Sequence, residues 1–177
     1  MFFKAKARFS IALLFSLFLI ASGLVYSHSG VKHDDEEAVK KGSKLQGNEE
    51  KAFIKINLQY TKEIKPIFER SCFDCHSDQT RYPWYHELPV IGKIIDEDIN
   101  EAREHLDFSS DFPFIGHGSP KNDLKEIKKS VMSGEMPPLE YKLLHWRASL
   151  SQNEKEAIAK WVADSLEKLD NIGSEIK

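Results

Sequence analysis

The run Cys72-Phe73-Asp74-Cys75-His76 constrains this chain more than any other feature, because it holds both cysteines of the 177-residue sequence. Two thiols three positions apart can each add to one vinyl group of a haem, and a histidine directly after the second can bind the iron from one side. We therefore expect one covalently attached haem c, held by Cys72 and Cys75, with His76 as the proximal iron ligand. No cysteine remains for a disulfide framework elsewhere in the chain.

Two other chemistries use closely spaced cysteines. A thioredoxin-like redox pair opens a helix that follows a strand, whereas here a helical pattern leads into the motif and no strand-helix-strand pattern surrounds it. A structural zinc site needs four ligands. Without a second cysteine pair, the others would have to come from His86, His105, His117 or His145. The adjacent histidine therefore favours haem over both alternatives.

The second axial position of the iron has several candidates. Met136 directly precedes Pro137 and Pro138, and a loop stiffened by two prolines can hold a thioether against the iron. We expect Met136 to be the second metal ligand, although methionine also serves as adaptable core packing. His117, between two glycines, and His145, next to a tryptophan, are the alternatives for a site with two histidines.

An aromatic block, Arg81-Tyr82-Pro83-Trp84-Tyr85, follows shortly after the motif. Its rings suit the face or edge of a haem, and Arg81, the indole of Trp84 or a tyrosine hydroxyl can bond the propionates. Ordinary aromatic packing explains the same residues equally well.

Residues 1–26 have the pattern of an export segment. Three basic residues in the first eight positions precede an apolar stretch over 9–26 that carries no charge. A stretch of this length also reaches the lower limit for a membrane-spanning helix, while Ala21-Ser22-Gly23 favours cleavage. The segment is therefore a signal peptide or a membrane anchor. Either one places the rest of the chain in the periplasm, free or attached to the inner membrane.

Residues 27–52 carry many charges of both signs and almost no large apolar side chain. Such a segment buries too little surface to offset its ordering entropy, so we expect a flexible charged linker there. The haem-binding domain is then expected over 53–170, with a short tail over 171–177. The net charge of −3 gives no sign of the basic character typical of nucleic-acid-binding domains, so no nucleic-acid partner is expected.

Helical signals dominate the expected domain, because no stretch alternates with period two between turn residues. Apolar periodicity and capping residues predict helices at about 64–71, 94–106, 120–133 and 151–169. The predicted fold class is mainly α, a cytochrome c-like helical domain around one haem behind the N-terminal segment. Long irregular connections are expected when a large flat ligand occupies the core in place of side chains.

Residues 71–77, 80–85, 134–138 and 150–151, the last just before a helix with a tryptophan, together resemble the bacterial haem-binding domain family. The resemblance implies a small cytochrome c-like domain with haem c on Cys72 and Cys75. It also implies His76 as the proximal ligand and Met136 as the distal one. Members commonly carry a His-Val-Gly-Arg-like stretch, and the region 95–103 lacks its histidine and glycine, which argues against a ligand there.

These features lead us to expect a monohaem c-type cytochrome that transfers electrons in the periplasm or at the outer face of the inner membrane. An iron with both axial positions filled exchanges electrons and does little else, so an electron carrier is expected rather than an enzyme. The sequence does not name the redox partner. The alternative is a haem peroxidase or a gas or redox sensor, in which the sixth ligand is labile and hydrogen peroxide or a diatomic gas binds the iron.

Overall fold

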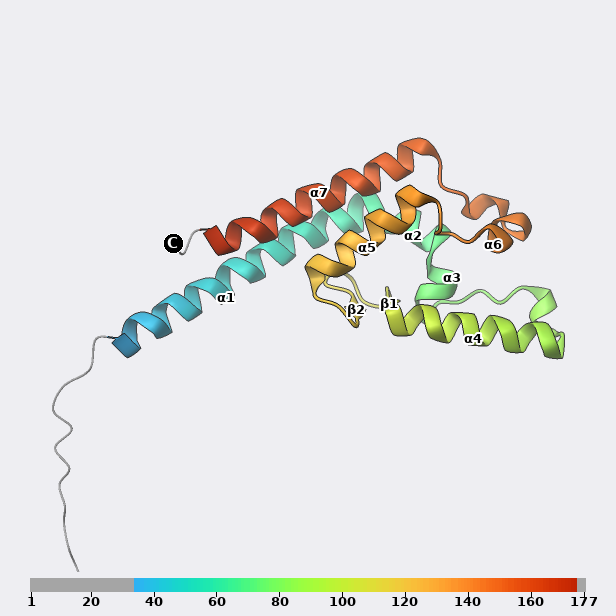
Figure 1. Cartoon of the computed structure of the whole chain (residues 1–177), viewed down its shortest axis with the longest axis horizontal. Helices are drawn as coiled ribbons and strands as arrows, with labels where there is room; N and C mark the ends of the chain where they lie inside the picture. The colour runs from blue at the N-terminus through green and yellow to red at the C-terminus, as the bar shows by residue number, and fades with distance from the viewer. Residues whose placement is uncertain (1–33, 175–177) are drawn as a thin grey trace, which may run out of the picture.

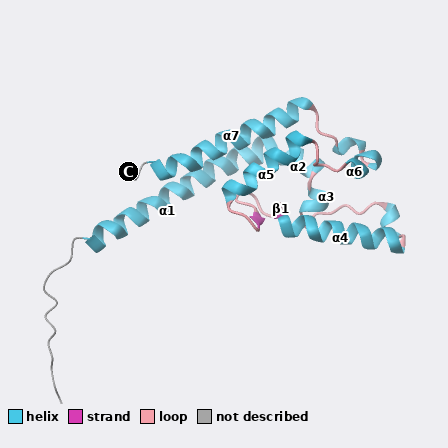
Figure 2. Ribbon diagram, in the orientation of Figure 1, coloured by secondary structure: helices cyan, strands magenta, loops and turns pink. Residues whose placement is uncertain are grey.

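The computed structural model describes residues 34–174, with side chains described for 46–172. The predicted signal or anchor over 1–26 and the end of the predicted tail lie outside the described residues. Helices make up most of the described chain, which confirms the mainly α fold class (Figure 2). Within this part, no helix combines the length and the apolar character needed to cross a membrane.

The chain is helical from Asp34 onward, in place of the flexible charged linker predicted over 27–52. Helix α1 spans Asp34–Gln59 and its side chains are buried from Ala52 on, at Ala52 and Ile56. Its charged half contains several glutamates and lysines, which favour helix, and acidic residues open the helix where its dipole favours them. A run of mixed charge is therefore compatible with helix here, and the helix continues into the buried positions Ala52 and Ile56.

A π-helical turn, η1 (Tyr60–Ile64), links α1 to the short helix α2 (Lys65–Ser71). Pro66 lies in the first turn of α2, where its missing N–H removes one backbone bond to the preceding turn. The predicted helix at 64–71 is thus the end of a longer helical path. The remaining elements are α3 (Phe73–His76), η2 (Trp84–Glu87), α4 (Pro89–His105), β1 (Leu106–Asp107), β2 (Ile115–Gly116), α5 (Pro120–Ser133), α6 (Leu139–Leu144), η3 (Trp146–Ala148) and α7 (Gln152–Ser174).

Helices α1, α5 and α7 pack together, with α7 against both α1 and α5 (Figure 1). Helix α4 runs along the opposite side of the molecule, and α2 and α3 connect the two parts. Helix α6 lies at the same end of the molecule as the start of α4, above it in Figure 1. The motif on α3 is therefore set between α4 and the end that carries α6.

Several helices begin or end at the capping residues that the sequence predicted. Ser119 caps α5, its hydroxyl accepting the Asn122 N–H at 3.4 Å, and Pro120 follows at the first helical position. Gly134 ends α5 in the left-handed conformation, with φ of 81°. At the start of α7, the Ser151 hydroxyl accepts the Glu154 N–H, and the Glu154 carboxylate accepts the Ser151 N–H at 2.8 Å, a capping box.

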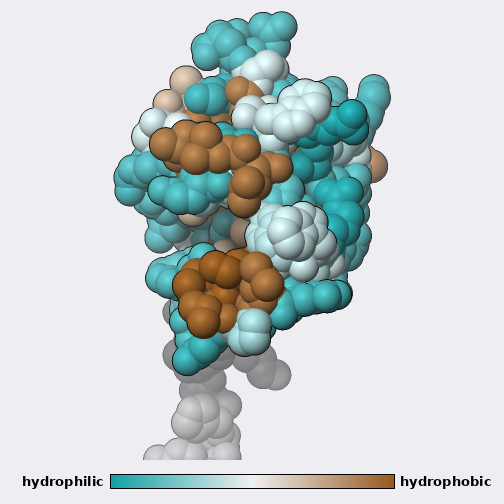
Figure 3. Space-filling view, turned by 90° about the vertical axis from the view of Figure 1, so that its right-hand side faces the viewer, coloured by the Kyte–Doolittle hydropathy of each residue, from teal (hydrophilic) through white to brown (hydrophobic). Residues whose placement is uncertain are grey.

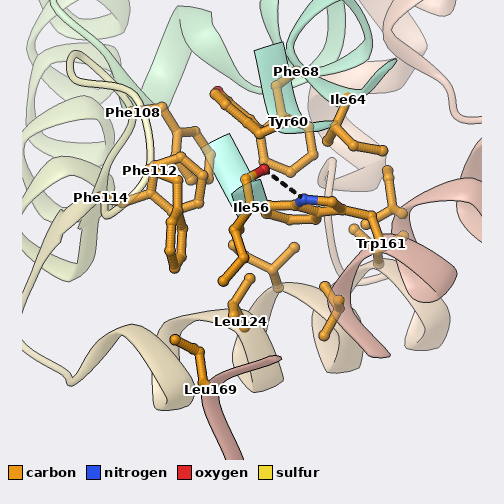
Figure 4. Packing of buried hydrophobic residues seen from close by; sticks show 14 of the residues in the cluster. Ile56, Tyr60, Ile64, Phe68, Phe108, Phe112, Phe114, Leu124, Trp161 and Leu169 are labelled. Carbon is orange, nitrogen blue, oxygen red and sulfur yellow. Dashed lines mark hydrogen bonds between the residues drawn. The ribbon is translucent and has the colours of Figure 1, made fainter. Parts of the chain in front are cut away.

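The core is built around Trp161, whose indole N–H reaches the Ile56 carbonyl at 3.5 Å (Figure 4). Tyr60 and Phe68 pack against it, with ring centroids 5.6 Å and 6.4 Å from the indole. The Tyr60 hydroxyl is buried and has no hydrogen-bond partner among the described residues. Burial raises the pKa of Tyr60, so this phenol stays neutral.

Aromatic rings continue from this core to the motif. Phe68 lies 4.9 Å from Phe108 between ring centroids, and Phe108 lies 5.4 Å from His76. Phe108 follows β1, which pairs antiparallel with β2 in the register Leu106 to Gly116. The sequence did not predict this hairpin, because two-residue strands show no alternation. It places the backbone after α4 directly beside the motif.

Candidate haem site

One tight stretch of backbone carries both thiols and the imidazole. Cys72 ends α2, where its N–H donates to the Phe68 carbonyl at 2.7 Å, and α3 begins at the next residue. The N–H groups of Cys75 and His76 both donate to the Cys72 carbonyl, at 3.2 and 3.0 Å. The three predicted attachment residues therefore lie within little more than one helical turn, which is the spacing that haem attachment needs.

The structure holds His76 in a form that can bind a metal. Its Nδ1 lies 2.8 Å from the Leu106 carbonyl oxygen. A carbonyl only accepts hydrogen bonds, so Nδ1 carries the proton and the lone pair of Nε2 is left for a ligand. Burial lowers the pKa of His76, which keeps the imidazole neutral. The Phe108 N–H also donates to the His76 carbonyl at 2.6 Å, fixing the backbone behind the ring.

The two cysteines are free thiols and only partly exposed. Burial raises the pKa of Cys72 to about 12 and raises that of Cys75 as well. Both are therefore protonated at neutral pH, and neither has the depressed pKa of a redox-active thiol. Within the described residues, no group of three or more metal-binding side chains forms a site of the zinc type.

Large apolar side chains stand exposed on the two elements that flank the motif. Val90 on α4 is 72% exposed and Leu143 on α6 is 73% exposed. Figure 3 shows two apolar patches at this end of the molecule, over α6 above and α4 below, with a hollow between them. The exposed apolar residues of these elements are Val90, Ile91, Ile94, Leu139, Leu143 and Leu144, and exposed Leu88 directly precedes α4.

Apolar surface of this kind is costly to leave in water, and facing patches across a hollow suit a flat apolar ligand. A haem has that shape, and the two thiols and the imidazole supply the groups that bind it. The residues present therefore fit a haem. Cys72 and Cys75 would hold its vinyl-derived carbons, His76 its iron, and the two apolar patches its faces.

Met136 lies on the loop between α5 and α6 and is 39% exposed. Its N–H donates to the Ser130 carbonyl at 3.1 Å. His145, at the end of α6, stacks on Tyr141 with centroids 4.2 Å apart, and His117 follows β2 with its ring 5.9 Å from that of His105. Met136 and His145 thus flank α6, which also carries one of the apolar patches, whereas His117 belongs to the hairpin region.

The aromatic block and its neighbours form polar contacts within the protein. Arg81 donates from Nε and from its backbone N–H to Asp74 Oδ1, both at 3.2 Å, so its guanidinium already has a carboxylate partner. Trp84 is 80% exposed. The His86 imidazole lies 2.8 Å from the Asp96 carboxylate.

Sequence reasoning missed Asp74 and Tyr141. The Tyr141 hydroxyl donates to Asp74 Oδ2 at 2.7 Å, joining α6 to the middle of the motif. The available signal was modest: Asp74 is a charged residue inside the motif, and Tyr141 precedes His145 by one helical turn. No local pattern shows that the two residues meet.

Two comparisons with known proteins found related sequences. The haem-binding domain family matches residues 36–164. The chain belongs to the haem-binding domain family. This result confirms the resemblance seen in the sequence, and the matched region begins inside the segment predicted as a linker, where the structure has α1.

The chain is also 27% identical over 97 residues to "Cytochrome c peroxidase Ccp" of Escherichia coli (strain K12). The matched segment covers 54% of this chain and 21% of that protein, so the chain spans about a fifth of the relative's length. No solved structure matches. The family and this relative together support haem as the group bound at the site.

Proposed function

We propose that this protein is a monohaem c-type cytochrome whose haem is attached covalently to Cys72 and Cys75, with His76 as the proximal iron ligand. The observation that carries the proposal is the bond from His76 Nδ1 to the Leu106 carbonyl at 2.8 Å. It fixes the tautomer and leaves Nε2 as the ligand atom, next to two protonated thiols on the same turn. Attachment needs only that each thiol add its sulfur and its hydrogen across one vinyl group.

Bound haem supplies an iron that alternates between two oxidation states, which is the chemistry of electron transfer. The chain's own residues hold His76 in place through Leu106 and Phe108, and the apolar patches on α4 and α6 would exclude water from the faces of a bound haem. Met136 is the proposed sixth ligand, because the adjoining prolines and its bond to Ser130 hold its backbone. His145 and His117 are the residues to test if Met136 fails.

The proposal includes export. The N-terminal segment 1–26 carries the protein to the periplasm, where it acts free or attached to the outer face of the inner membrane. Its partner in electron transfer is a second redox protein, and no nucleic acid takes part. Thioether attachment suits this setting, because haem held by covalent bonds is retained where replacement is difficult.

The test is a pyridine haemochrome spectrum of the full chain, made in a host that attaches haem c, after denaturation and removal of free haem. We expect a haem c spectrum from the wild-type protein, a single-thioether spectrum from Cys72→Ala, and no retained haem from Cys72→Ala combined with Cys75→Ala. Cys75→Ala alone is the matched partner of the first variant. Haem retained by the double variant would refute covalent attachment at these residues.

A second candidate function is reduction of hydrogen peroxide. The likeness to a protein named as a cytochrome c peroxidase favours it, as does the partial exposure of Met136. Each peroxide takes two electrons and two protons to give two waters, so a reduced donor protein would have to supply the electrons. Peroxide-dependent oxidation of a reduced cytochrome by the wild-type protein would support this function. Turnover no faster than that of free haem would exclude it.

A further inference from the structure

A single hydrogen bond joins the two segments that carry the proposed axial ligands. The Tyr141 hydroxyl donates to Asp74 Oδ2 at 2.7 Å. Asp74 lies between Cys72 and Cys75, inside the motif that ends at His76. Tyr141 lies on α6, which begins three residues after Met136. The bond therefore joins the segment of the proposed proximal ligand to the helix that follows the proposed distal one.

Asp74 is a fixed acceptor. Its other oxygen, Oδ1, accepts from the backbone N–H and from Nε of Arg81, each at 3.2 Å. Arg81 also donates from its guanidinium to the Glu69 carbonyl at 3.1 Å, which ties the arrangement to α2. The Asp74 side chain is 17% exposed. Its orientation is thus set by α2 and the motif, and Oδ2 is presented to Tyr141.

Tyr141 is held from the other side. Its ring stacks on His145 with the planes 15° apart, and His145 Nδ1 donates to the Tyr141 carbonyl at 3.2 Å. Tyr141 lies on α6 and His145 directly follows it, so the bond from Tyr141 to Asp74 restrains the position of the whole short helix. Helix α6 has six residues and none of them is buried. Few other contacts compete with the bond to Asp74.

Met136 depends on the position of α6. On its N-terminal side, the Met136 N–H is bonded to the Ser130 carbonyl of α5 at 3.1 Å. On its C-terminal side, Pro137 and Pro138 restrict the backbone, and the Lys142 N–H donates to the Pro138 carbonyl at 3.1 Å. Because this connection is restricted, a displacement of α6 also displaces Met136.

We propose that Tyr141 and Asp74 are positioning residues that keep the Met136 thioether at the sixth coordination position of the haem iron. This inference rests on the proposed function and on Met136 as ligand. Loss of the bond shifts the balance toward detached methionine by about tenfold to a hundredfold, the range spanned by hydrogen bonds to charged groups. Neither residue touches the iron, and both act through α6.

The test uses the full chain with attached haem and carbon monoxide as a probe of the free sixth position in the reduced protein. In Tyr141→Phe, which keeps the ring that stacks on His145, the apparent affinity for carbon monoxide rises about tenfold to a hundredfold. The methionine-to-iron charge-transfer band weakens and the midpoint potential falls. Glu140→Gln is the matched control, because Glu140 lies on the same helix, is exposed and forms no hydrogen bond or ion pair with the other described residues. It should leave all three readouts unchanged.

Met136→Ala sets the scale for complete loss of the ligand. If Met136→Ala raises the carbon monoxide affinity and Tyr141→Phe does not, the positioning role is overturned while the sixth ligand stands. If Met136→Ala itself changes nothing, Met136 is not the ligand and that part of the proposed function fails. Should Tyr141→Phe not accumulate, Asp74→Asn keeps an oxygen acceptor without the charge and should raise the affinity by a smaller factor. No rise in Asp74→Asn would equally overturn the role.

Discussion

Glu154 is the residue whose replacement should reveal most about how the helices around the motif are held together. One carboxylate oxygen accepts from the Arg70 guanidinium at 2.8 Å, and the other accepts from the N–H and the hydroxyl of Ser151, each at 2.8 Å. Arg70 lies on α2, two residues before Cys72, and Ser151 caps α7. Glu154 therefore connects the start of the last helix to the helix that delivers the first thiol.

Glu154→Gln removes the charge and keeps the shape. Glutamine also serves at this position of a capping box, so the bond to the Ser151 N–H can persist, weakened by the loss of charge. Loss of a partly exposed ion pair costs about 0.2–1 kcal/mol, and the Glu154 side chain is 23% exposed. We therefore expect the free energy of unfolding to fall by about 0.5–1.5 kcal/mol at pH 7. For a helical domain of about 140 residues this lowers the melting temperature by roughly 3 °C.

The effect should depend on pH in a defined direction. The bond from Arg70, with help from Ser151, lowers the pKa of Glu154 from 4.5 to about 2. The charged form is thus favoured in the folded state, so its stabilisation is complete above pH 4.5 and is lost as the pH falls toward 2. The difference between wild type and Glu154→Gln should shrink to roughly half by pH 3.

Urea unfolding followed by circular dichroism, at pH 7 and pH 3, measures both effects. Glu156→Gln is the matched control, because Glu156 is exposed and, among the described residues, accepts a hydrogen bond only from Gln152. It should change the unfolding free energy by less than about 0.5 kcal/mol. An equal effect of the two variants, or a Glu154→Gln effect that grows as the pH falls, would refute the role assigned to Glu154.

Three further substitutions test the core and the loop that carries Met136. Tyr60→Phe removes a buried hydroxyl that has no hydrogen-bond partner among the described residues. The free energy of unfolding, measured by thermal unfolding, should rise by about 1 kcal/mol. A fall of that size would mean that the hydroxyl forms a hydrogen bond. Leu124→Ala opens a cavity at a fully buried position and should cost about 2–5 kcal/mol in urea unfolding, whereas a cost under about 1 kcal/mol would contradict the packing. In Gly134→Ala the added methyl group has no close neighbour, but alanine must adopt the φ of 81° that Gly134 has. The free energy of unfolding should therefore fall by about 1–2 kcal/mol. No change would show that the turn adopts another conformation.

The sequence predicted what depends on neighbours in the chain. The ends of α5 followed from Ser119-Pro120 and Gly134, and the start of α7 from Ser151 with Glu154, because caps act over one helical turn. The motif from Cys72 to His76 could be recognised for the same reason, because its residues are adjacent in the sequence. The first half of α1 was missed because alternating charges fit a solvated tether as well as an exposed helix face, and only its packed continuation at Ala52 and Ile56 decides between them.

The parts that escaped prediction depend on residues far apart in the sequence. His76 is held by Leu106 and Phe108, thirty or more positions later, through a hairpin too short to show a strand pattern. The bond from Arg81 to Asp74, seven positions earlier, was not predicted either. Tyr141 reaches the same carboxylate from α6. Such pairs follow from the tertiary arrangement and leave no periodic trace in the sequence.

The central claim is that Cys72 and Cys75 bind one haem covalently, and an intact mass spectrum of the exported protein under denaturing conditions tests it most directly. The account predicts a single species heavier by the mass of one haem, and Cys72→Ala combined with Cys75→Ala returns it to the mass of the polypeptide alone. The same spectrum reports whether 1–26 is removed. A polypeptide that carries no added mass, although its maturation host attaches haem to other c-type cytochromes, would contradict the account.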